Sequence, residues 1–286
     1  MTDTPATHRL GVIYMTIASL AWSTGGLFTR YMTTDLATTV FWRSIFACLG
    51  LAVVLLMFQG LAGLASFKRL KGPGILTAIF GGTAAFTTVP AFQYTSVAHV
   101  VVIYATAPFL AGAIAWLVFG QRPNWVDVVA SLFALIGAAT MIGFGGEGGL
   151  WGDALALVMT FSMSCVMVLF RQYPDVPSLP TAVLAFGLSS VASLFLLQDH
   201  SIPYAALPFL AAFGMVNSGL GTAFFLLGSR LLRPVETALL GALETPMAPL
   251  WVWLFWGETP GIATAIGGAV VMATVIWHTV RNAHPA

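Results

Sequence analysis

The sequence predicts an all-α membrane protein with ten transmembrane helices, arranged as two inverted five-helix repeats whose termini both lie in the cytoplasm. Three observations lead to this prediction: an apolar composition, a one-sided distribution of basic residues and an internal repeat. Of the 286 residues, 58% are hydrophobic and only 7% are charged, with a mean hydropathy of +0.91. A bilayer offers the backbone no hydrogen-bonding partners, so spanning segments must be helices or a closed barrel, and uninterrupted apolar runs favour helices.

Long apolar runs separated by short polar breaks mark the helices in order along the chain. The breaks carry turn residues, for example Gly72-Pro73 and Tyr173-Pro174-Asp175. No small-residue cleavage site precedes the second run, so we interpret the first run as a helix rather than a signal peptide. The expected spans are 10–32, 36–59, 73–93, 97–119, 125–144, 150–170, 180–197, 202–228, 235–256 and 261–279.

The basic residues orient these spans. With the N-terminus inside, nine of the eleven Lys and Arg residues fall on the cytoplasmic side, while Arg30 lies at an outer end and Arg43 within a span. A missing or additional span would scatter the later arginines over both faces, so the charge bias supports the helix count as well. The nine are Arg9, Lys68, Arg69, Lys71, Arg122, Arg171, Arg230, Arg233 and Arg281.

The fourth and ninth spans look like copies of each other. Trp116, Phe119, Gly120 and Pro123 correspond to Trp253, Trp256, Gly257 and Pro260 at one constant offset, with a one-residue slip at the first prolines. Residues 1–144 and 145–286 then form two repeats of five spans each. Because five is odd, the repeats must lie upside down relative to each other, an arrangement typical of secondary transporters.

Several functional classes receive no support from the sequence. The net charge is +1 with scattered basic residues, which argues against nucleic acid as a partner. Cys48 and Cys165 lie within apolar runs and are interpreted as small buried hydrophobes. The chain has no GxxxxGK[ST] or HExxH segment, and its few ionisable residues are spread singly, so we expect no ATPase, catalytic site, metal or cofactor. The expected partners are the lipid bilayer and a small molecule, with protons as a candidate co-substrate.

Two segments resemble a known family. The segment FWRSIFA around Arg43 and the segment LETPMAPLWVWLFWGE of the ninth span are similar to the EamA-like branch of the drug/metabolite transporter superfamily. One departure is Gly120-Gln121, where the repeat usually ends in Gly-Glu. The resemblance implies export of amino acids, other metabolites or drugs across a bacterial cytoplasmic (inner) membrane. It also implies a central cavity between the halves, lined mainly by spans 1, 3, 4, 6, 8 and 9.

Glu244 is the first candidate for a functional residue. It lies about two turns into the ninth span, and an ionised carboxylate facing lipid at that depth would cost at least a few kcal/mol. Glu244 should therefore face protein or water. We interpret it as a residue that exchanges a proton during transport or pairs with a substrate amine, and the alternative is a packing carboxyl hydrogen-bonded to a neighbour.

Prolines mark the same region of both halves. Pro108 in the fourth span and Pro246 in the ninth cannot donate backbone hydrogen bonds, so each span should be kinked with free acceptors at mid-depth. Discontinuities at corresponding positions of two repeats favour a binding site there, although each proline alone could be a tolerated kink.

Three further residues are candidates for gating or coupling. His99 and Glu236 occupy corresponding places near the starts of spans 4 and 9 and could act as paired gates, although favourable placement at a helix N-terminus explains Glu236 equally well. Arg43 lies about two turns into the second span, where it could receive a carboxylate or lock helices together.

The expected wall of the cavity combines aromatic and amide side chains, which suit a small zwitterion or a planar metabolite. For each aromatic residue alone, placement against lipid is the more common outcome. Besides Glu244, the residues expected to contact substrate are Trp22, Phe86, Gln93, Tyr104, Phe161, Ser164, Asn217 and Trp251.

Together these features predict a secondary transporter that exports small metabolites such as amino acids by alternating access around a central cavity. Two alternatives stay open from the sequence. One is a facilitator of small solutes without ion coupling, and the other, from a different class, is a membrane scaffold that transports nothing.

Overall fold

The predicted all-helical class is confirmed: helices joined by turns make up the part of the chain that the computed structural model describes, with no strand among those residues. The described residues are 5–25, 28, 34–95, 100, 103–122, 124–142, 149–197, 204–256 and 262–283. The helices are α1 (Pro5–Ser23), α3 (Leu36–Gln59), α4 (Ala62–Ala65), η1 (Ser66–Arg69), α5 (Gly72–Tyr94), α7 (Ala107–Phe119), α8 (Trp125–Ile142), α9 (Leu150–Gln172), α10 (Ser178–Leu194), α11 (Leu207–Ala212), η2 (Phe213–Leu220), α12 (Gly221–Ser229), α13 (Pro234–Gly241), α14 (Glu244–Trp256) and α15 (Ile262–Ala283).

Four helical segments of the described chain are long and apolar enough to cross a membrane: α3, α5, α9 and the continuous segment Leu207–Ser229 formed by α11, η2 and α12. Each reaches 23 or 24 residues, which at about 1.5 Å per residue exceeds the hydrocarbon thickness of a bilayer. Shorter apolar helices lie in α7, α8, α10 and α15. The short helices α4 and η1, between α3 and α5, have no counterpart in the sequence prediction.

The fourth and ninth predicted spans are interrupted rather than kinked. α7 begins after a turn at Ala105 and Thr106, and α14 begins after a turn at Ala242 and Leu243. Pro108 and Pro246 therefore fall in the first turns of the helices that follow, where a missing N–H group removes no intrahelical hydrogen bond. The prolines mark the interruptions, but the break itself lies just before each proline.

The predicted span 202–228 contains a π-helix, η2, between two α-helical segments. η2 packs tightly against α3 through glycines: a Cβ at Gly214 would lie 2.6 Å from the carbonyl oxygen of Arg43, and one at Gly50 would lie 3.3 Å from Cα of Met215. Asn217 in the π-helix donates hydrogen bonds to the carbonyl oxygens of Ala21 (3.1 Å) and Trp22 (2.8 Å), so it satisfies acceptors at the end of α1.

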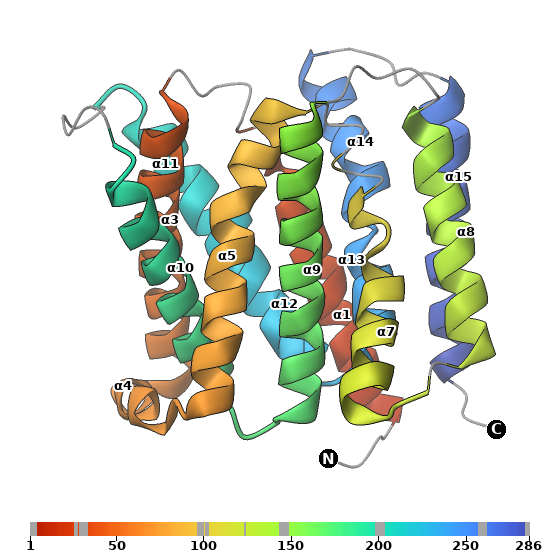
Figure 1. The fold of residues 1–286 in the computed structure, drawn as a ribbon, viewed down its shortest axis with the longest axis horizontal. Helices are drawn as coiled ribbons and strands as arrows, with labels where there is room; N and C mark the ends of the chain where they lie inside the picture. The colour runs from red at the N-terminus through yellow and green to blue at the C-terminus, as the bar shows by residue number, and fades with distance from the viewer. Residues whose placement is uncertain are drawn as a thin grey trace.

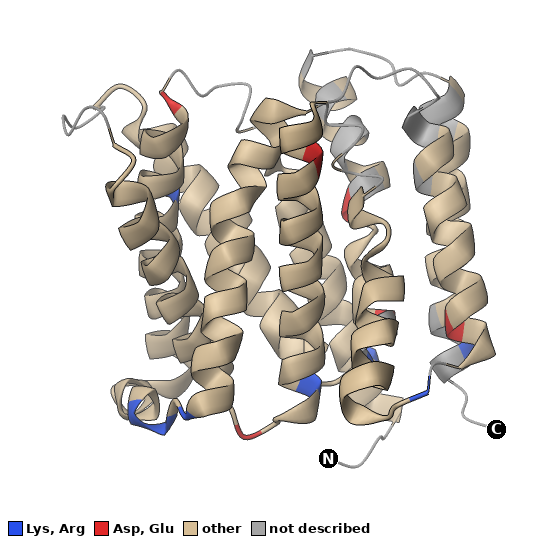
Figure 2. Ribbon diagram, in the orientation of Figure 1, with Lys and Arg blue, Asp and Glu red and all other residues tan. Residues whose placement is uncertain are grey.

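Helices far apart in sequence pack side by side (Figure 1). α5 packs against α9 and α10, η2 packs against α3, α12 packs against α1, and α8 pairs with α15 at one side of the bundle. α1 begins and α15 ends at the same end of the bundle (Figure 1). Among the described residues, Lys and Arg gather almost entirely at that end (Figure 2).

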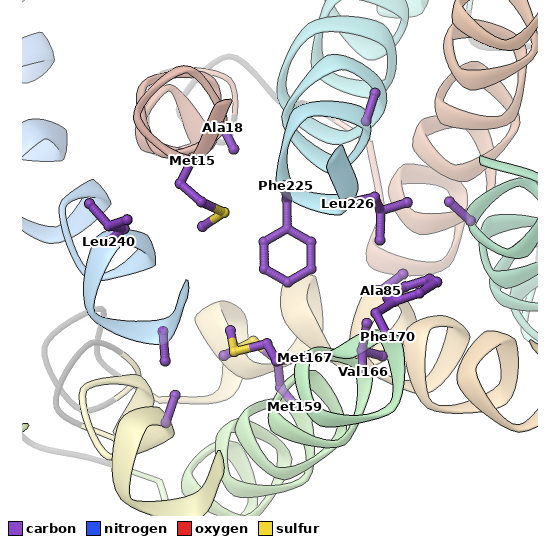
Figure 3. Packing of buried hydrophobic residues seen from close by; sticks show 14 of the residues in the cluster. Met15, Ala18, Ala85, Met159, Val166, Met167, Phe170, Phe225, Leu226 and Leu240 are labelled. Carbon is purple, nitrogen blue, oxygen red and sulfur yellow. The ribbon is translucent and has the colours of Figure 1, made fainter. Parts of the chain in front are cut away.

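A large hydrophobic cluster extends over most of the helices and includes a contact between α1, α9 and α12. Figure 3 shows the ring of Phe225 pointing from α12 toward Met159 and Met167 of α9, with Met15 of α1 beside it. Phe225 is 1% exposed and Met15 and Met167 are fully buried, so this contact joins the N-terminal helix to the second half of the chain.

Candidate functional site

A cavity of about 480 Å³ lies between the helices of the two halves. This volume suits a small organic molecule. Its described lining comes from α1, α3, α5, α9, α10, η2, α12 and α14, together with Gly25, Val100 and Tyr104, whereas α8 and α15 contribute none of it.

Apolar and aromatic side chains make up most of the wall. Trp22 and Phe225 pack with ring centroids 5.0 Å apart, and Phe213 lies on the α3 side of the cavity beneath Arg43. The large apolar residues of the wall are Trp22, Phe92, Tyr104, Met159, Met163, Phe170, Phe186, Phe213, Phe225 and Leu226. Such a wall favours a ligand with an apolar body.

Most hydroxyl groups in the wall are already used by the protein. Thr39, Thr77 and Thr88 each donate to a backbone carbonyl one turn earlier in their own helix, at 2.9, 2.7 and 2.6 Å. Ser23 Oγ donates to the carbonyl oxygen of Leu20 (2.7 Å) and accepts from Trp251 Nε1 (2.7 Å). Few polar groups are thus left to bind a ligand, and the charged ones among them are Glu244 and Arg43.

Glu244 enters the cavity at the interruption between α13 and α14. It is the first residue of α14, where the helix dipole favours a negative charge. The hydroxyl of Tyr104 lies 3.5 Å from the position that a Cβ on Gly241 would occupy, so Tyr104 packs against α13 beside this break. No Lys, Arg or His of the described chain lies within ion-pairing distance of Glu244.

Arg43 enters the cavity from α3 and is 4% exposed. One terminal nitrogen donates to the carbonyl oxygen of Ala85 at 2.6 Å, and the guanidinium lies 5.2 Å from the ring centroid of Phe213. Its Nε is buried and has no hydrogen-bond partner within the described residues. The cavity therefore carries one positive and one negative side chain, neither paired with an opposite charge of the described chain.

The structure brings six of the sequence candidates to the cavity wall: Trp22, Arg43, Gln93, Tyr104, Asn217 and Glu244. Four residues that were expected to contact substrate lie elsewhere. Trp251 supports the wall from behind through its bond to Ser23, and Ser164 donates to the carbonyl oxygens of Ala107 (3.3 Å) and Thr160 (2.8 Å).

Phe86 and Phe161 also lie away from this cavity. Phe86 lines a separate cavity of about 270 Å³ between α3, α5 and α10. Phe161 is 46% exposed on α9 and makes an edge contact with Phe80, with ring centroids 6.2 Å apart. An exposed aromatic side chain on an apolar helix is the usual arrangement for a lipid-facing residue.

The candidates for gating take different positions. His99 lies outside the described residues. Glu236 is 2% exposed and lies 2.6 Å from Nε2 of His8, which joins α13 to α1. Pro108 and Pro246 are buried in the first turns of α7 and α14. Glu236, Pro108 and Pro246 do not line the cavity.

A second buried ionic cluster centres on Asp127 of α8. Its Oδ1 lies 2.9 Å from Nε2 of His278 on α15, and its Oδ2 lies 3.2 Å from a terminal nitrogen of Arg233. The cluster joins α8 and α15 to the start of α13, away from the residues that line the cavity.

Helices α3 and α10 contribute to the cavity although the sequence resemblance implied spans 1, 3, 4, 6, 8 and 9. The contributing residues of α3 and α10 include Thr39, Ala182, Ala185 and Phe186. Those four, and Phe213 on η2, were not among the sequence candidates. The spacing of residues in the sequence does not distinguish them, because each of these helices carries apolar residues on all of its faces.

Comparisons with known proteins agree with this architecture. The EamA-like transporter family matches the chain in two stretches, residues 9–143 and residues 150–280. Solute carrier family 35 member G1 of Mus musculus is 22% identical over 308 residues, which cover 96% of this chain and 79% of that protein. A solved protein crystal structure is similar with a TM-score of 0.78 at 19% sequence identity, covering 95% of this chain and 98% of that one. At that identity the structural likeness concerns the fold alone.

Proposed function

The chain belongs to the EamA-like transporter family, and we propose that it exports small metabolites such as amino acids across the cytoplasmic membrane of a bacterium by alternating access. Membership makes it an integral multi-pass membrane protein and a transporter of the drug/metabolite transporter superfamily. The cargo, the direction and the mechanism are the proposed parts.

The position of Glu244 carries this proposal. A carboxylate at the break of a helix, facing a cavity whose wall is mostly apolar, can pair with the amine of a substrate or exchange a proton during transport. Interrupted helices at corresponding positions of two halves are typical of the binding sites of repeat transporters.

Alternating access is supported by the correspondence of the two halves. α7 and α14 both have 13 residues, and both follow a two-residue turn. The packing of the two halves also corresponds. From the first half α5 contacts α9 and α10, and from the second half the segment of η2 and α12 contacts α1 and α3. Two inverted repeats can exchange conformations, and this exchange would open the cavity alternately to each side of the membrane.

The cytoplasmic placement of both termini is supported by the charge distribution. α1 begins and α15 ends at the end of the bundle where Lys and Arg gather (Figure 2). Loops rich in basic residues stay on the cytoplasmic side during membrane insertion.

Counterflow in proteoliposomes tests the proposal. Vesicles containing the purified chain are loaded with one unlabelled amino acid at a time, and uptake of the same labelled amino acid is measured. We expect uptake above that of protein-free vesicles for at least one amino acid, together with a change in rate when a pH gradient is imposed.

The outcomes separate the alternatives. A counterflow rate that does not change with the pH gradient would indicate a facilitator without proton coupling. An absence of flux across amino acids and a panel of other small metabolites would overturn the proposal and favour a scaffold.

A further inference from the structure

Arg43 is a buried cation without a countercharge among the described residues. The residue is 4% exposed, its Nε has no hydrogen-bond partner in the part of the chain that the structure describes, and no carboxylate there lies within 4 Å of its guanidinium. Burying an unpaired charge costs several kcal/mol even after relaxation of the surroundings. The carbonyl of Ala85 and the ring of Phe213 offset only part of this cost, since a cation–π contact contributes about 0.5–2 kcal/mol.

The side chain is also held in place rather than free to move to the membrane surface. The hydrogen bond to Ala85 joins it to α5, and the ring of Phe213 joins it to η2. The backbone of Arg43 lies against Gly214, where a Cβ would approach its carbonyl oxygen to 2.6 Å. Three helices thus fix a guanidinium at the cavity wall with donors left over.

We propose that Arg43 binds the carboxylate of the transported molecule, and that the cavity selects a zwitterion with an apolar body. A guanidinium presents its N–H donors in a planar fork that matches a carboxylate, which supplies the missing countercharge and the missing acceptor together. This inference rests on the proposed function, because it assigns the chemistry of the cargo at the same cavity.

The remainder of the cavity favours a zwitterion over other anions. Glu244 would repel a second negative group on the ligand, which disfavours dicarboxylates and phosphate esters, and it would attract an ammonium group. The aromatic and methionine side chains that line the same cavity form an apolar wall for the body of the ligand.

Binding of three matched probes to the full chain in lipid nanodiscs tests the inference. The probes are phenylalanine, phenylalaninamide, which lacks the carboxylate, and 3-phenylpropionate, which lacks the amine. For the unchanged protein we expect phenylalanine to bind at least about tenfold more tightly than either analogue, since each analogue loses one charge-assisted contact.

Substitutions at Arg43 test whether this residue causes the preference for phenylalanine over its amide. Arg43→Gln should remove the preference for phenylalanine over its amide, while the preference over 3-phenylpropionate stays. Arg43→Lys keeps the charge but not the planar fork. It should therefore keep part of the acid-over-amide ratio, which is the affinity for phenylalanine divided by the affinity for phenylalaninamide. If Arg43→Gln does not fold, the ratio in Arg43→Lys decides, because an unaltered ratio would overturn the inference.

Arg230→Gln is the matched control. Arg230 is also a largely buried guanidinium over a phenyl ring, 5.5 Å from the centroid of Phe170, but it does not line the cavity. We expect Arg230→Gln to leave the acid-over-amide ratio unchanged. An Arg43→Gln variant that lowers the melting temperature but keeps the unaltered ratio would show that Arg43 only braces the helices.

The same probes distinguish this inference from the proposed function. Equal binding of phenylalanine and its amide, or no binding of phenylalanine, would overturn the assignment of a zwitterionic cargo even if the protein transports other solutes. Carboxylate-dependent binding without any flux in proteoliposomes would instead overturn transport and leave the role of Arg43 intact.

Discussion

Ala107 and Glu244 each begin a helix of 13 residues after a two-residue turn, and they are separated along the chain by the same number of residues as Trp116 and Trp253. The two halves thus place the same backbone break beside the cavity, but only the second half puts a carboxylate there. This asymmetry makes Glu244 the acid to test for substrate recognition and proton coupling.

Replacement of this carboxylate should impair transport. We expect Glu244→Gln to lower the counterflow rate about tenfold or more and to flatten its pH dependence, because the amide neither carries charge nor exchanges a proton. Counterflow measured at several pH values checks this expectation. Asp175→Asn, which neutralises an exposed acid outside the cavity, serves as the control, and an unchanged pH profile in Glu244→Gln would rule out a role in coupling.

The close approach of η2 to α3 should tolerate no added methyl group at Gly214. A Cβ there would clash with the carbonyl oxygen of Arg43 and with the Cβ of Phe46, so we expect Gly214→Ala to destabilise the protein by about 1–3 kcal/mol. The same change should weaken ligand binding, since it displaces the segment of α3 that carries Arg43. Thermal unfolding in detergent and phenylalanine binding measure the two effects.

Gly187→Ala is the control for the added methyl group. Gly187 lies within α10, and a Cβ there would meet nothing within 4 Å. Its replacement by Ala should leave stability unchanged or raise it by about 0.5–1 kcal/mol, as expected for a glycine in a helix interior. If Gly214→Ala and Gly187→Ala lowered the free energy of unfolding equally, the close contact between α3 and η2 would not limit stability.

The ionic cluster at Asp127 should stabilise the pairing of α8 and α15. Asp127→Asn leaves His278, which is 1% exposed, and Arg233 without their anion, so we expect a loss of about 3–5 kcal/mol. Arg233→Gln should cost only about 1 kcal/mol, because the side chain of Arg233 is 38% exposed and its charge is screened by solvent. Equilibrium unfolding that ranks Arg233→Gln as the more damaging change would contradict this account.

The N-cap of α3 should make stability depend on pH in the acidic range. Burial raises the pKa of Asp35, but hydrogen bonds from the side chain and backbone of Thr38 and the backbone of Ala37 outweigh it, so the pKa lies below its usual value of 3.8. A lowered pKa in the folded state stabilises the protein above the unfolded pKa, and this stabilisation is lost as the pH falls through the folded pKa.

Melting temperatures of two variants measure this effect. Asp35→Ala should cost about 1 kcal/mol at neutral pH, the usual value of an N-cap, and the difference from the unchanged protein should narrow toward pH 3. Asp35→Asn keeps a capping oxygen without an ionisable group, so its own stability should lack this acidic transition. A difference between Asp35→Ala and the unchanged protein that stays constant down to pH 3 would argue against the ionised cap.

Some elements of the fold were predictable because each depends on a local property. The bounds of α3 agree with the predicted span, since an apolar run between Asp35 and Gly60 has a capping residue at each end. The positions of the helix breaks were predictable only approximately. Pro108 and Pro246 mark them, but proline is compatible both with a kink in a continuous helix and with the first turn of a new one.

The sequence alone determined that the protein lies in a membrane, that it is helical and which family it belongs to. The length of the apolar runs, the positions of the basic residues and the repeated segments are properties of the chain that require no knowledge of packing. The sequence also singled out Glu244, since an ionised acid deep in an apolar span is costly when it faces lipid and must therefore face protein or water. Tertiary structure decided which helix faces converge. It placed Arg43 at the cavity wall and Phe86 and Phe161 away from it. Successive residues of a helix point about 100° apart, and in a span that is apolar all round no local signal reports which direction meets another helix.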